Sequence, residues 1–335
     1  MSKPMLKNVL ITGGAGYVGS ALVPSLLDKG YNVAVYDLYL YGDVFREIEN
    51  NPNLTQIKAD IRNKDKLVEA MKNIDAVIHL ACISNDPSYE LDPELGKSIN
   101  LDAFYNVIEA AEENNAKRFI YASTSSVYGI KEEKNVRETD TCKPLTDYSK
   151  FKLECEKILL NREKKDMTRV VLRPATVCGY ARRLRLDLVV NVLTIHALEN
   201  KKIRVYGGTQ LRPNINIKDR VRVYELLLTA PSEKIDGEIF NAGYQNLSVD
   251  EIANLIKNTI GNSDIDIEHI PTDDIRSYHI NSDKIKDALG FEPEYSIEDA
   301  VKSLVDAYNN GLIEDGLNNP LYHNIKTMKI VKLKW

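Results

Sequence analysis

The stretch from Asn8 to Gly19, NVLITGGAGYVG, joins a short apolar run to a cluster of glycines. The apolar run, Asn8–Thr12, has the length and composition of a buried strand, and Val18–Lys29 has the apolar spacing of a helix. Glycines between a strand and a helix let the chain turn tightly and bring its backbone close to a pyrophosphate, which a helix N-terminus attracts. The stretch therefore predicts a pyrophosphate-binding turn in an α/β sheet. The residues expected to touch the bound dinucleotide are Gly13, Gly16, Tyr17, Val18 and Gly19.

A carboxylate closes the next apolar run. Asn32–Asp37 reads as a second strand, and Asp37 lies roughly 20 residues beyond the glycines. At that place a carboxylate binds both hydroxyls of an adenosine ribose and repels a 2′-phosphate. The pattern predicts NAD as the cofactor in preference to NADP, and the alternative for Asp37 is a simple cap at the end of the strand.

The rest of the first half alternates short apolar runs with helical patterns, which implies right-handed crossovers and a parallel sheet. Further strands are expected at Thr55–Lys58, Ala76–Leu80, Arg118–Ser123 and Thr168–Leu172, and further helices at Lys64–Lys72, Pro93–Asn114 and Tyr148–Glu163. The fold class is therefore α/β, a Rossmann-type doubly wound parallel sheet with a smaller mixed α/β lobe for substrate. We expect residues 1–173 to form the nucleotide-binding domain and residues 174–335 to form mainly the substrate lobe, with some segments returning to the first domain.

Composition narrows the classes of partner. A chain of 335 residues with 43% apolar and 28% charged residues can bury a large core, and its length favours two lobes. The net charge of -5 argues against nucleic acid and anionic membranes as partners. No apolar run reaches the length of a membrane span, no signal peptide is evident, and the five histidines show no metal-binding spacing. Four scattered cysteines predict no disulfide framework, so we expect a small-molecule substrate and a cytoplasmic location.

Tyr148 and Lys152 are four residues apart and would share one face of the predicted helix. Taken alone, such a pair is most often an ordinary surface pair. Upstream, the strand at Arg118–Ser123 runs directly into a hydroxyl-rich turn, STSSVYG. A parallel sheet exposes its ligand-binding groups at such strand ends, although serine and threonine also serve there as helix caps.

Four motifs taken together resemble one family. TGGAGYVG, HLA at His79–Ala81, STSSVYG and Y-x-x-x-K follow one another as in the extended short-chain dehydrogenase/reductases, and the resemblance covers almost the whole chain. That family includes nucleotide-sugar epimerases, dehydratases, dehydrogenases and ketoreductases. The resemblance implies an NAD-dependent enzyme whose substrate is a nucleotide-diphosphate sugar. Many relatives pair through two long helices, so a homodimer or a higher homo-oligomer is expected.

The resemblance also implies roles for single residues. Tyr148 would be the general base that removes a proton from a sugar hydroxyl, and Lys152 would lower the pKa of Tyr148 and hold the nicotinamide ribose. Thr124 would hydrogen-bond the reacting hydroxyl, with Ser125 as a less fitting substitute. Further cofactor contacts are implied for Asp60 and Ile61 at the adenine, for Leu80 and Ala81 along the cofactor, and for Asn100, which would help order the site or lie on a helix surface.

Substrate contacts are implied in the second half. The segment Arg204–Asp219 resembles the part of the family's substrate lobe whose arginine grips the nucleotide diphosphate, and Arg212 matches that arginine. Arg276 matches a second arginine near the phosphates, with an exposed surface charge as its alternative. The run RRLRLDLVVN, residues 182–191, could bring another cation and Asn191 to the nucleotide, or be ordinary solvated charge.

Departures from the family pattern favour some of the family's reactions over others. In sugar 4,6-dehydratases an aspartate and a glutamate follow the active threonine, whereas this chain has Ser125 and Ser126, which cannot readily replace carboxylates in an elimination. Cys178 replaces a tyrosine usual in the family and is expected to alter the pocket wall. The leading expectation is an epimerase that acts through a 4-keto sugar. The alternatives are a 4-dehydrogenase or 4-ketoreductase, because residues 182–191 and 211–217 look similar to segments of enzymes acting on GDP-heptoses, and a non-catalytic NAD sensor, which predicts a damaged Thr-Tyr-Lys triad.

Overall fold

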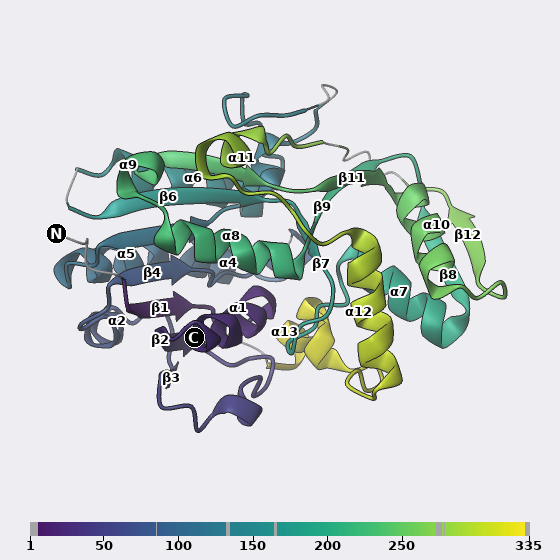
Figure 1. Ribbon diagram of the computed structural model, residues 1–335, viewed down its shortest axis with the longest axis horizontal. Helices are drawn as coiled ribbons and strands as arrows, with labels where there is room; N and C mark the ends of the chain where they lie inside the picture. The colour runs from purple at the N-terminus through teal and green to yellow at the C-terminus, as the bar shows by residue number, and fades with distance from the viewer. Residues whose placement is uncertain are drawn as a thin grey trace.

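A seven-stranded sheet forms the centre of the larger lobe (Figure 1). The structure is a computed structural model that describes residues 6–84, 86–131, 135–163, 166–272, 277 and 279–331. The strand order is β10-β6-β5-β4-β1-β2-β3, and every neighbouring pair is parallel. The strands are β1 (Asn8–Thr12), β2 (Asn32–Asp37), β3 (Leu54–Lys58), β4 (Ala76–His79), β5 (Arg118–Ala122), β6 (Thr168–Pro174) and β10 (Glu238–Ala242).

Helices cover both faces of this sheet. One face carries α1 (Tyr17–Asp28) and α8 (Ile217–Thr229), and the other carries α2 (Lys64–Ala70), α5 (Ala103–Glu113) and α6 (Asp147–Asn161). Successive side chains of a strand point to opposite faces, so Val9 and Ile11 pack in one core while Leu10 packs in the other. The doubly wound parallel sheet predicted from the sequence is therefore confirmed.

One predicted helix differs in detail. The run from Pro93 to Asn114 consists of α4 (Pro93–Lys97), the π-helical turn η2 (Ser98–Asp102) and then α5. Apolar periodicity does not distinguish a π turn from an α-helical one, because the apolar side chains keep nearly the same face. The π turn carries Asn100 into the interior, where it is buried.

The smaller lobe comes from the second half of the chain. It has a three-stranded sheet, β11-β9-β7, a parallel pair, β12-β8, and its own apolar core (Figure 1). Its elements are β7 (Thr176–Cys178), α7 (Val189–Asn200), β8 (Lys202–Tyr206), β9 (Leu211–Asn216), β11 (Gln245–Ser248), α10 (Val249–Ile260), β12 (Asp266–Ile270) and α12 (Ile297–Asn309). The second half also supplies α8 and β10 to the larger lobe, so the chain passes between the two lobes more than once.

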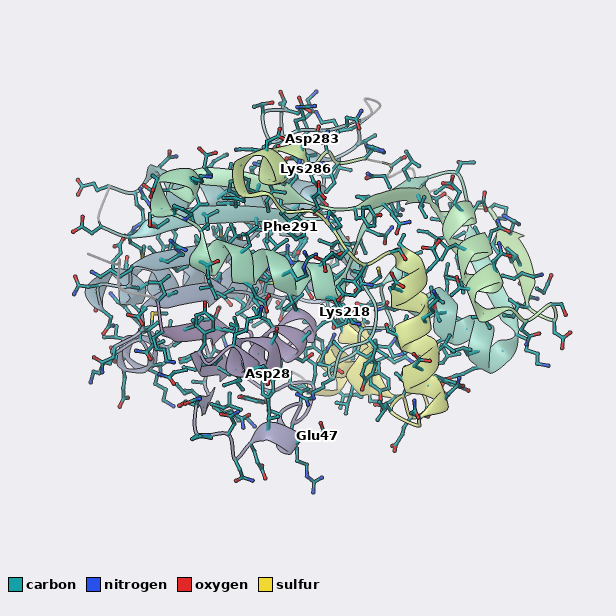
Figure 2. All side chains as sticks on the ribbon, in the orientation of Figure 1. Asp28, Glu47, Lys218, Asp283, Lys286 and Phe291 are labelled. Carbon is teal, nitrogen blue, oxygen red and sulfur yellow. The ribbon has the colours of Figure 1, made fainter. Side chains whose placement is uncertain are left out.

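The remaining elements are short. They are η1 (Arg46–Ile48), α3 (Asp86–Tyr89), η3 (Ser125–Tyr128), α9 (Ser232–Ile235), α11 (Asp283–Leu289), η4 (Pro320–Tyr322) and α13 (Asn324–Val331). Charged side chains such as Asp28 and Glu47 project outward (Figure 2). Within the described residues, none of the helices combines the length and the apolar character needed to cross a bilayer.

Candidate active site

A cavity of about 400 Å³ opens at the carboxyl ends of the parallel strands. This is the edge at which open α/β sheets bind their ligands, because the loops after the strands diverge there. Its wall includes residues of the glycine turn and of the loops after β2, β3, β4, β5 and β6. Most of the predicted cofactor and catalytic residues line it, namely Gly13, Gly16, Tyr17, Val18, Gly19, Asp37, Asp60, Ile61, Leu80, Ala81, Thr124, Ser125, Tyr148 and Lys152.

The glycine turn needs glycine for steric reasons. Gly13 has a φ of +71°, and a Cβ built on it would lie 2.5 Å from the backbone nitrogen of Ala81. A Cβ on Gly19 would lie 2.2 Å from the carbonyl oxygen of Gly14, so the first turn of α1 packs directly on the loop. This close packing leaves the N-terminus of α1 facing the cavity, where its free N–H groups favour an anion. The turn therefore fits the pyrophosphate of a dinucleotide.

Asp37 is held at the end of β2 by backbone groups. Its two carboxylate oxygens accept hydrogen bonds from the N–H of Ala15, at 3.0 Å, and from the N–H of Tyr39, at 2.7 Å. Burial raises the pKa of Asp37, and the hydrogen bonds from Tyr39 and Ala15 partly offset that effect. Each oxygen keeps a further lone pair for a ribose hydroxyl.

The wall beside the end of β3 contains a second carboxylate. Asp60, which follows β3, accepts hydrogen bonds from the Arg62 guanidinium and forms an ion pair with it at 2.6 Å. Ile61 is buried beside Asp60 and offers an apolar surface to a flat ring. Leu80 and Ala81 follow β4 and face the glycine turn.

Tyr148 and Lys152 lie in successive turns of α6 and both reach the cavity. The Lys152 ammonium is buried, donates a hydrogen bond of 2.7 Å to the carbonyl oxygen of Ala122, and lies 6.0 Å from the centre of the Tyr148 ring. Helix α6 starts with a capping box in which Thr146 and Ser149 bond each other's backbone, which fixes the helix just before Tyr148. The sequence pair is therefore an internal pair directed at the cavity.

The hydroxyl-rich turn after β5 lines the same cavity as this pair. Thr124 caps the short helix η3 by accepting a hydrogen bond from the Ser126 N–H, and its hydroxyl lies 2.9 Å from the Ser126 hydroxyl. Thr124 therefore serves as a helix cap and also lines the cavity, so the two readings of this turn do not exclude each other. Ser125 is buried, and both serines line the cavity.

Several predicted residues lie elsewhere. Asn100 is outside the wall, where its amide bonds both backbone groups of Ile83 and fixes the loop after β4. Asn191 is fully buried: its oxygen accepts from the Gly179 N–H, and its nitrogen donates to the Tyr17 hydroxyl and the Arg185 carbonyl. Asn100 thus orders the loop after β4, as one reading of the sequence expected, and ligand contacts by Asn100 and Asn191 stay predictions.

Three further expectations concern the second half. Arg212, on β9, is not part of the cavity wall. Arg276 falls outside the described residues. Cys178 was expected to alter the pocket wall, but its side chain is fully buried in the core of the smaller lobe, where its thiol donates to the Ile215 carbonyl. That expectation is wrong, because β7 turns this side chain away from the cavity.

The structure adds wall residues that motif reasoning missed. They include Arg183, Arg185, Arg220, Tyr224, Asn324 and Met328. The two arginines after β7 belong to the basic run that the sequence left open. No motif marks Arg220, which lies in an ordinary amphipathic helix. Arg220 is buried and donates to the Tyr224 hydroxyl, and its Nε and Nη1 have no hydrogen-bond partner in the described parts of the chain. No motif marks Asn324 or Met328, because only folding brings α13 to the cavity.

Comparisons with known proteins agree with this arrangement. The model of the NAD dependent epimerase/dehydratase family matches residues 9–243. An uncharacterized UDP-glucose epimerase of Bacillus subtilis is 30% identical, over 91% of this chain and 99% of its own length. The low-salt glycan biosynthesis protein Agl12 of Haloferax volcanii is 28% identical, over 90% of this chain and 98% of its own length.

Solved structures give the same result. The UDP-glucose 4-epimerase of Thermotoga maritima, solved with UDP-glucose, is 26% identical with a TM-score of 0.82, covering 91% of this chain and 99% of its own. The UDP-glucuronic acid 4-epimerase of Bacillus cereus, solved with UDP-glucuronic acid and NAD, is 27% identical with a TM-score of 0.82, covering 90% and 99%. With the family model matched over most of its length, this chain belongs to the NAD-dependent epimerase/dehydratase family.

Proposed function

We propose that this protein epimerises a nucleotide-activated sugar at C4 with NAD as cofactor. The observation that carries the proposal is the meeting of Thr124, Tyr148 and Lys152 in one cavity whose other end holds the glycine turn and Asp37. The intact triad also argues against a non-catalytic NAD sensor, which would not need a buried cation beside a tyrosine.

Three side chains have distinct roles in the oxidation of the sugar. The Tyr148 phenolate removes the proton of the sugar C4 hydroxyl, and the Lys152 ammonium stabilises that phenolate while the Ala122 carbonyl holds the ammonium in place. The Thr124 hydroxyl orients the reacting hydroxyl. NAD, when bound, takes up the hydride from C4 and gives it back.

Epimerisation uses the same groups in reverse. After oxidation the sugar carries a C4 ketone and Tyr148 carries the proton. If the ketone turns its other face toward the cofactor before the hydride returns, Tyr148 protonates the new alkoxide and the product is the C4 epimer. The mass of the substrate is unchanged, and Tyr148 recovers its starting state.

The cavity gives little support for dehydration. Elimination of water across C5 and C6 needs an acid and a base near the sugar. Among the described wall residues the carboxylates are Asp37 and Asp60, which follow β2 and β3 and lie at the adenosine end. Around Thr124 the wall offers the hydroxyls of Ser125 and Ser126.

The relatives support a nucleotide sugar as substrate, since the solved neighbours named above hold UDP-glucose and UDP-glucuronic acid. The test is mass spectrometry with isomer-resolving chromatography on UDP-, GDP-, CDP- and dTDP-sugars, a GDP-heptose included, incubated with the pure protein and NAD. A new isomer of unchanged mass is expected. Loss of two hydrogens would replace the proposal with a 4-dehydrogenase, and loss of water would replace it with a dehydratase. Tyr148→Phe in parallel shows that the activity belongs to this site.

A further inference from the structure

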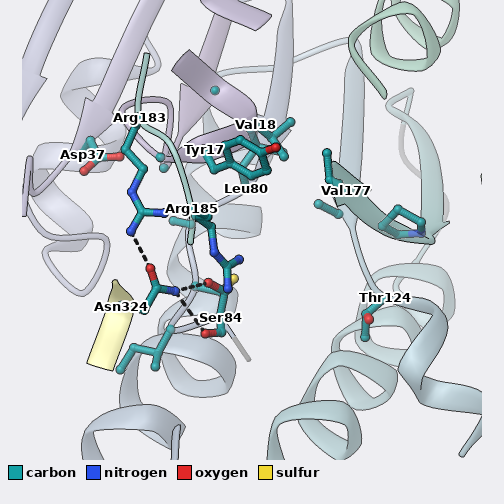
Figure 3. Close-up of a pocket in the computed structure, with 18 of the residues that line it drawn as sticks. Tyr17, Val18, Asp37, Leu80, Ser84, Thr124, Val177, Arg183, Arg185 and Asn324 are labelled. Carbon is teal, nitrogen blue, oxygen red and sulfur yellow. Dashed lines mark hydrogen bonds between the residues drawn. The ribbon is translucent and has the colours of Figure 1, made fainter. Parts of the chain in front are cut away.

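Arg183 sits in the loop between β7 and α7 but reaches the cavity of the larger lobe. Its backbone N–H donates to the Ser20 hydroxyl, at 3.1 Å, in the first turn of α1. Its side chain lies beside Asp37 and Tyr17 (Figure 3), and the whole residue is only 3% exposed. The loop between β7 and α7 therefore brings a cation to the glycine turn and the first turn of α1.

The charge of Arg183 is met differently from the charges of the neighbouring arginines. Arg182 pairs with Glu47 at 2.9 Å, and Arg185 is bound through two nitrogens by Asp187. Arg183 instead stacks on the Tyr41 ring, 3.7 Å from its centre, and its Nε has no hydrogen-bond partner among the described residues. Burial lowers the pKa of Arg183 to about 10, so it stays a cation at neutral pH. The carboxylates of Asp37 and Asp187 act on this charge through space, and the unbonded Nε leaves the guanidinium able to bind an anionic ligand in the cavity.

Asn324 links this cation to the C-terminal helix. Its side-chain oxygen accepts a hydrogen bond from Arg183 Nη2, and its nitrogen donates to the hydroxyl of Ser84, at 2.9 Å, in the loop after β4 (Figure 3). Asn324 is itself 2% exposed, and Met328 of the same helix also lines the cavity. Three segments distant in sequence are thus joined across the cavity by two side chains.

We infer that Arg183 binds the pyrophosphate of the dinucleotide beside the first turn of α1, and that Asn324 holds it there as a clasp that slows release of the cofactor. The inference rests on the proposed use of NAD. The recognised chemistry is a diphosphate, which NAD and a nucleotide sugar both carry. The position of Arg183, against α1 and beside Asp37, favours the diphosphate of the dinucleotide. An epimerase gains from such a clasp, because it must keep one cofactor molecule through both halves of its cycle.

The test measures the rate at which bound NAD leaves the full-length protein. Protein loaded with isotope-labelled NAD is diluted into excess unlabelled NAD, and the labelled NAD that stays bound is followed by mass spectrometry. Arg183→Gln is expected to release NAD roughly tenfold faster or more, because it removes a charge-assisted hydrogen bond to phosphate. Arg183→Lys keeps the charge and should fall between. Asn324→Ala should also release NAD faster, by less than Arg183→Gln, since the cation remains.

The matched control is Arg182→Gln, which removes a neighbouring guanidinium that lies outside the wall. Its release rate should equal that of the natural protein. Equal rates for Arg183→Gln and the natural protein would overturn the inference. Titration of UDP and GDP into NAD-loaded protein separates the two sources of diphosphate: weaker binding of these nucleotides by Arg183→Gln, with NAD release unchanged, would assign Arg183 to the substrate.

Failure of the proposed function is distinguishable from failure of the clasp. If the natural protein does not bind NAD at all, the proposed function falls. If it binds NAD and all variants release it at one rate, only the clasp falls. Thermal unfolding of each variant checks its fold, and if Arg183→Gln fails to fold, Arg183→Lys and Asn324→Ala decide the matter.

Discussion

Lys152 donates a hydrogen bond of 2.7 Å from its buried ammonium to the backbone carbonyl oxygen of Ala122. The bond ties α6 to the end of β5, so the cation is fixed before any ligand arrives. Preorganised charge of this kind stabilises a developing anion without reorganisation during the reaction. Replacing Lys152 with methionine keeps the length of the side chain and removes the charge. We expect turnover to fall by roughly 10² or more and the pH optimum to move upward, because the Tyr148 phenolate then forms only at higher pH. An unchanged pH profile would show that Lys152 has only a structural role.

Tyr148→Phe removes the proposed base and leaves the cofactor turn intact. We expect turnover to fall by roughly 10² to 10⁴, the usual contribution of general acid–base catalysis, with NAD content unchanged. Isomer formation and bound NAD are measured on the same preparation. Turnover at the natural rate in this variant would contradict the assignment of Tyr148 as the base.

Asp37→Asn tests the ribose contact and its pH dependence. Because burial raises the pKa of Asp37, its carboxylate takes up a proton at a higher pH than an exposed aspartate does. NAD affinity should therefore weaken as the pH falls through that raised pKa. In Asp37→Asn the affinity should be lower at neutral pH, the preference for NAD over NADP should shrink, and this pH dependence should disappear. Calorimetric titration of both cofactors from roughly pH 4.5 to roughly pH 8 measures the affinity, the cofactor preference and the pH dependence. An unchanged ratio of the two affinities would contradict the contact.

Gly13→Ala compared with Gly30→Ala separates two costs of a side chain. Both glycines have positive φ, +71° and +82°, and each substitution should cost about 1 kcal/mol or more through that conformation. A Cβ at position 13 also meets the Ala81 backbone at 2.5 Å, whereas at position 30 the nearest atom is the end of the Lys7 side chain at 4.0 Å. The alanine at position 13 should therefore lower the free energy of unfolding further and weaken NAD binding. Equal losses of stability would mean that the loop moves to accept the Cβ.

The burial of His79 should make the stability of the fold depend on pH. Burial lowers its pKa from 6.5 to about 3, and the Lys152 charge adds to the effect. The folded protein keeps this ring neutral while the unfolded chain protonates it below pH 6.5, so stability falls as the pH drops from 6.5 toward 3. At pH 5 the loss from this group is about 2 kcal/mol. His79→Gln removes that contribution, and urea unfolding at pH 7 and pH 5 should show a flatter dependence. An equal change of the unfolding free energy between pH 7 and pH 5 in both proteins would show that groups other than His79 dominate.

Local sequence predicted the larger lobe well. The runs Asn8–Thr12 and Asn32–Asp37 form strands with the predicted limits, because a strand buried on both faces of a parallel sheet leaves a nearly continuous apolar run. The glycine turn and the pair Tyr148 and Lys152 were also found, since each is a local arrangement on one strand-to-helix turn or one helix. These features need only neighbours within a few residues.

The placement of polar and charged residues in the second half was harder to predict. Asn191 belongs to a motif that suggested a ligand contact, but its three hydrogen bonds are all made within the protein. Arg183 stands one residue from Arg182, and nothing in the local sequence says which of them is buried in the cavity and which meets Glu47 at the surface.

The sequence by itself determined the doubly wound sheet, the dinucleotide turn and the catalytic pair, because periodicity, glycine geometry and helical spacing act over short distances. Only the tertiary structure decided which cations face the cavity and that Asn324 joins Arg183 to Ser84. Those contacts join residues more than a hundred positions apart. Their partners are chosen by how the two lobes pack, and packing is a property of the whole fold.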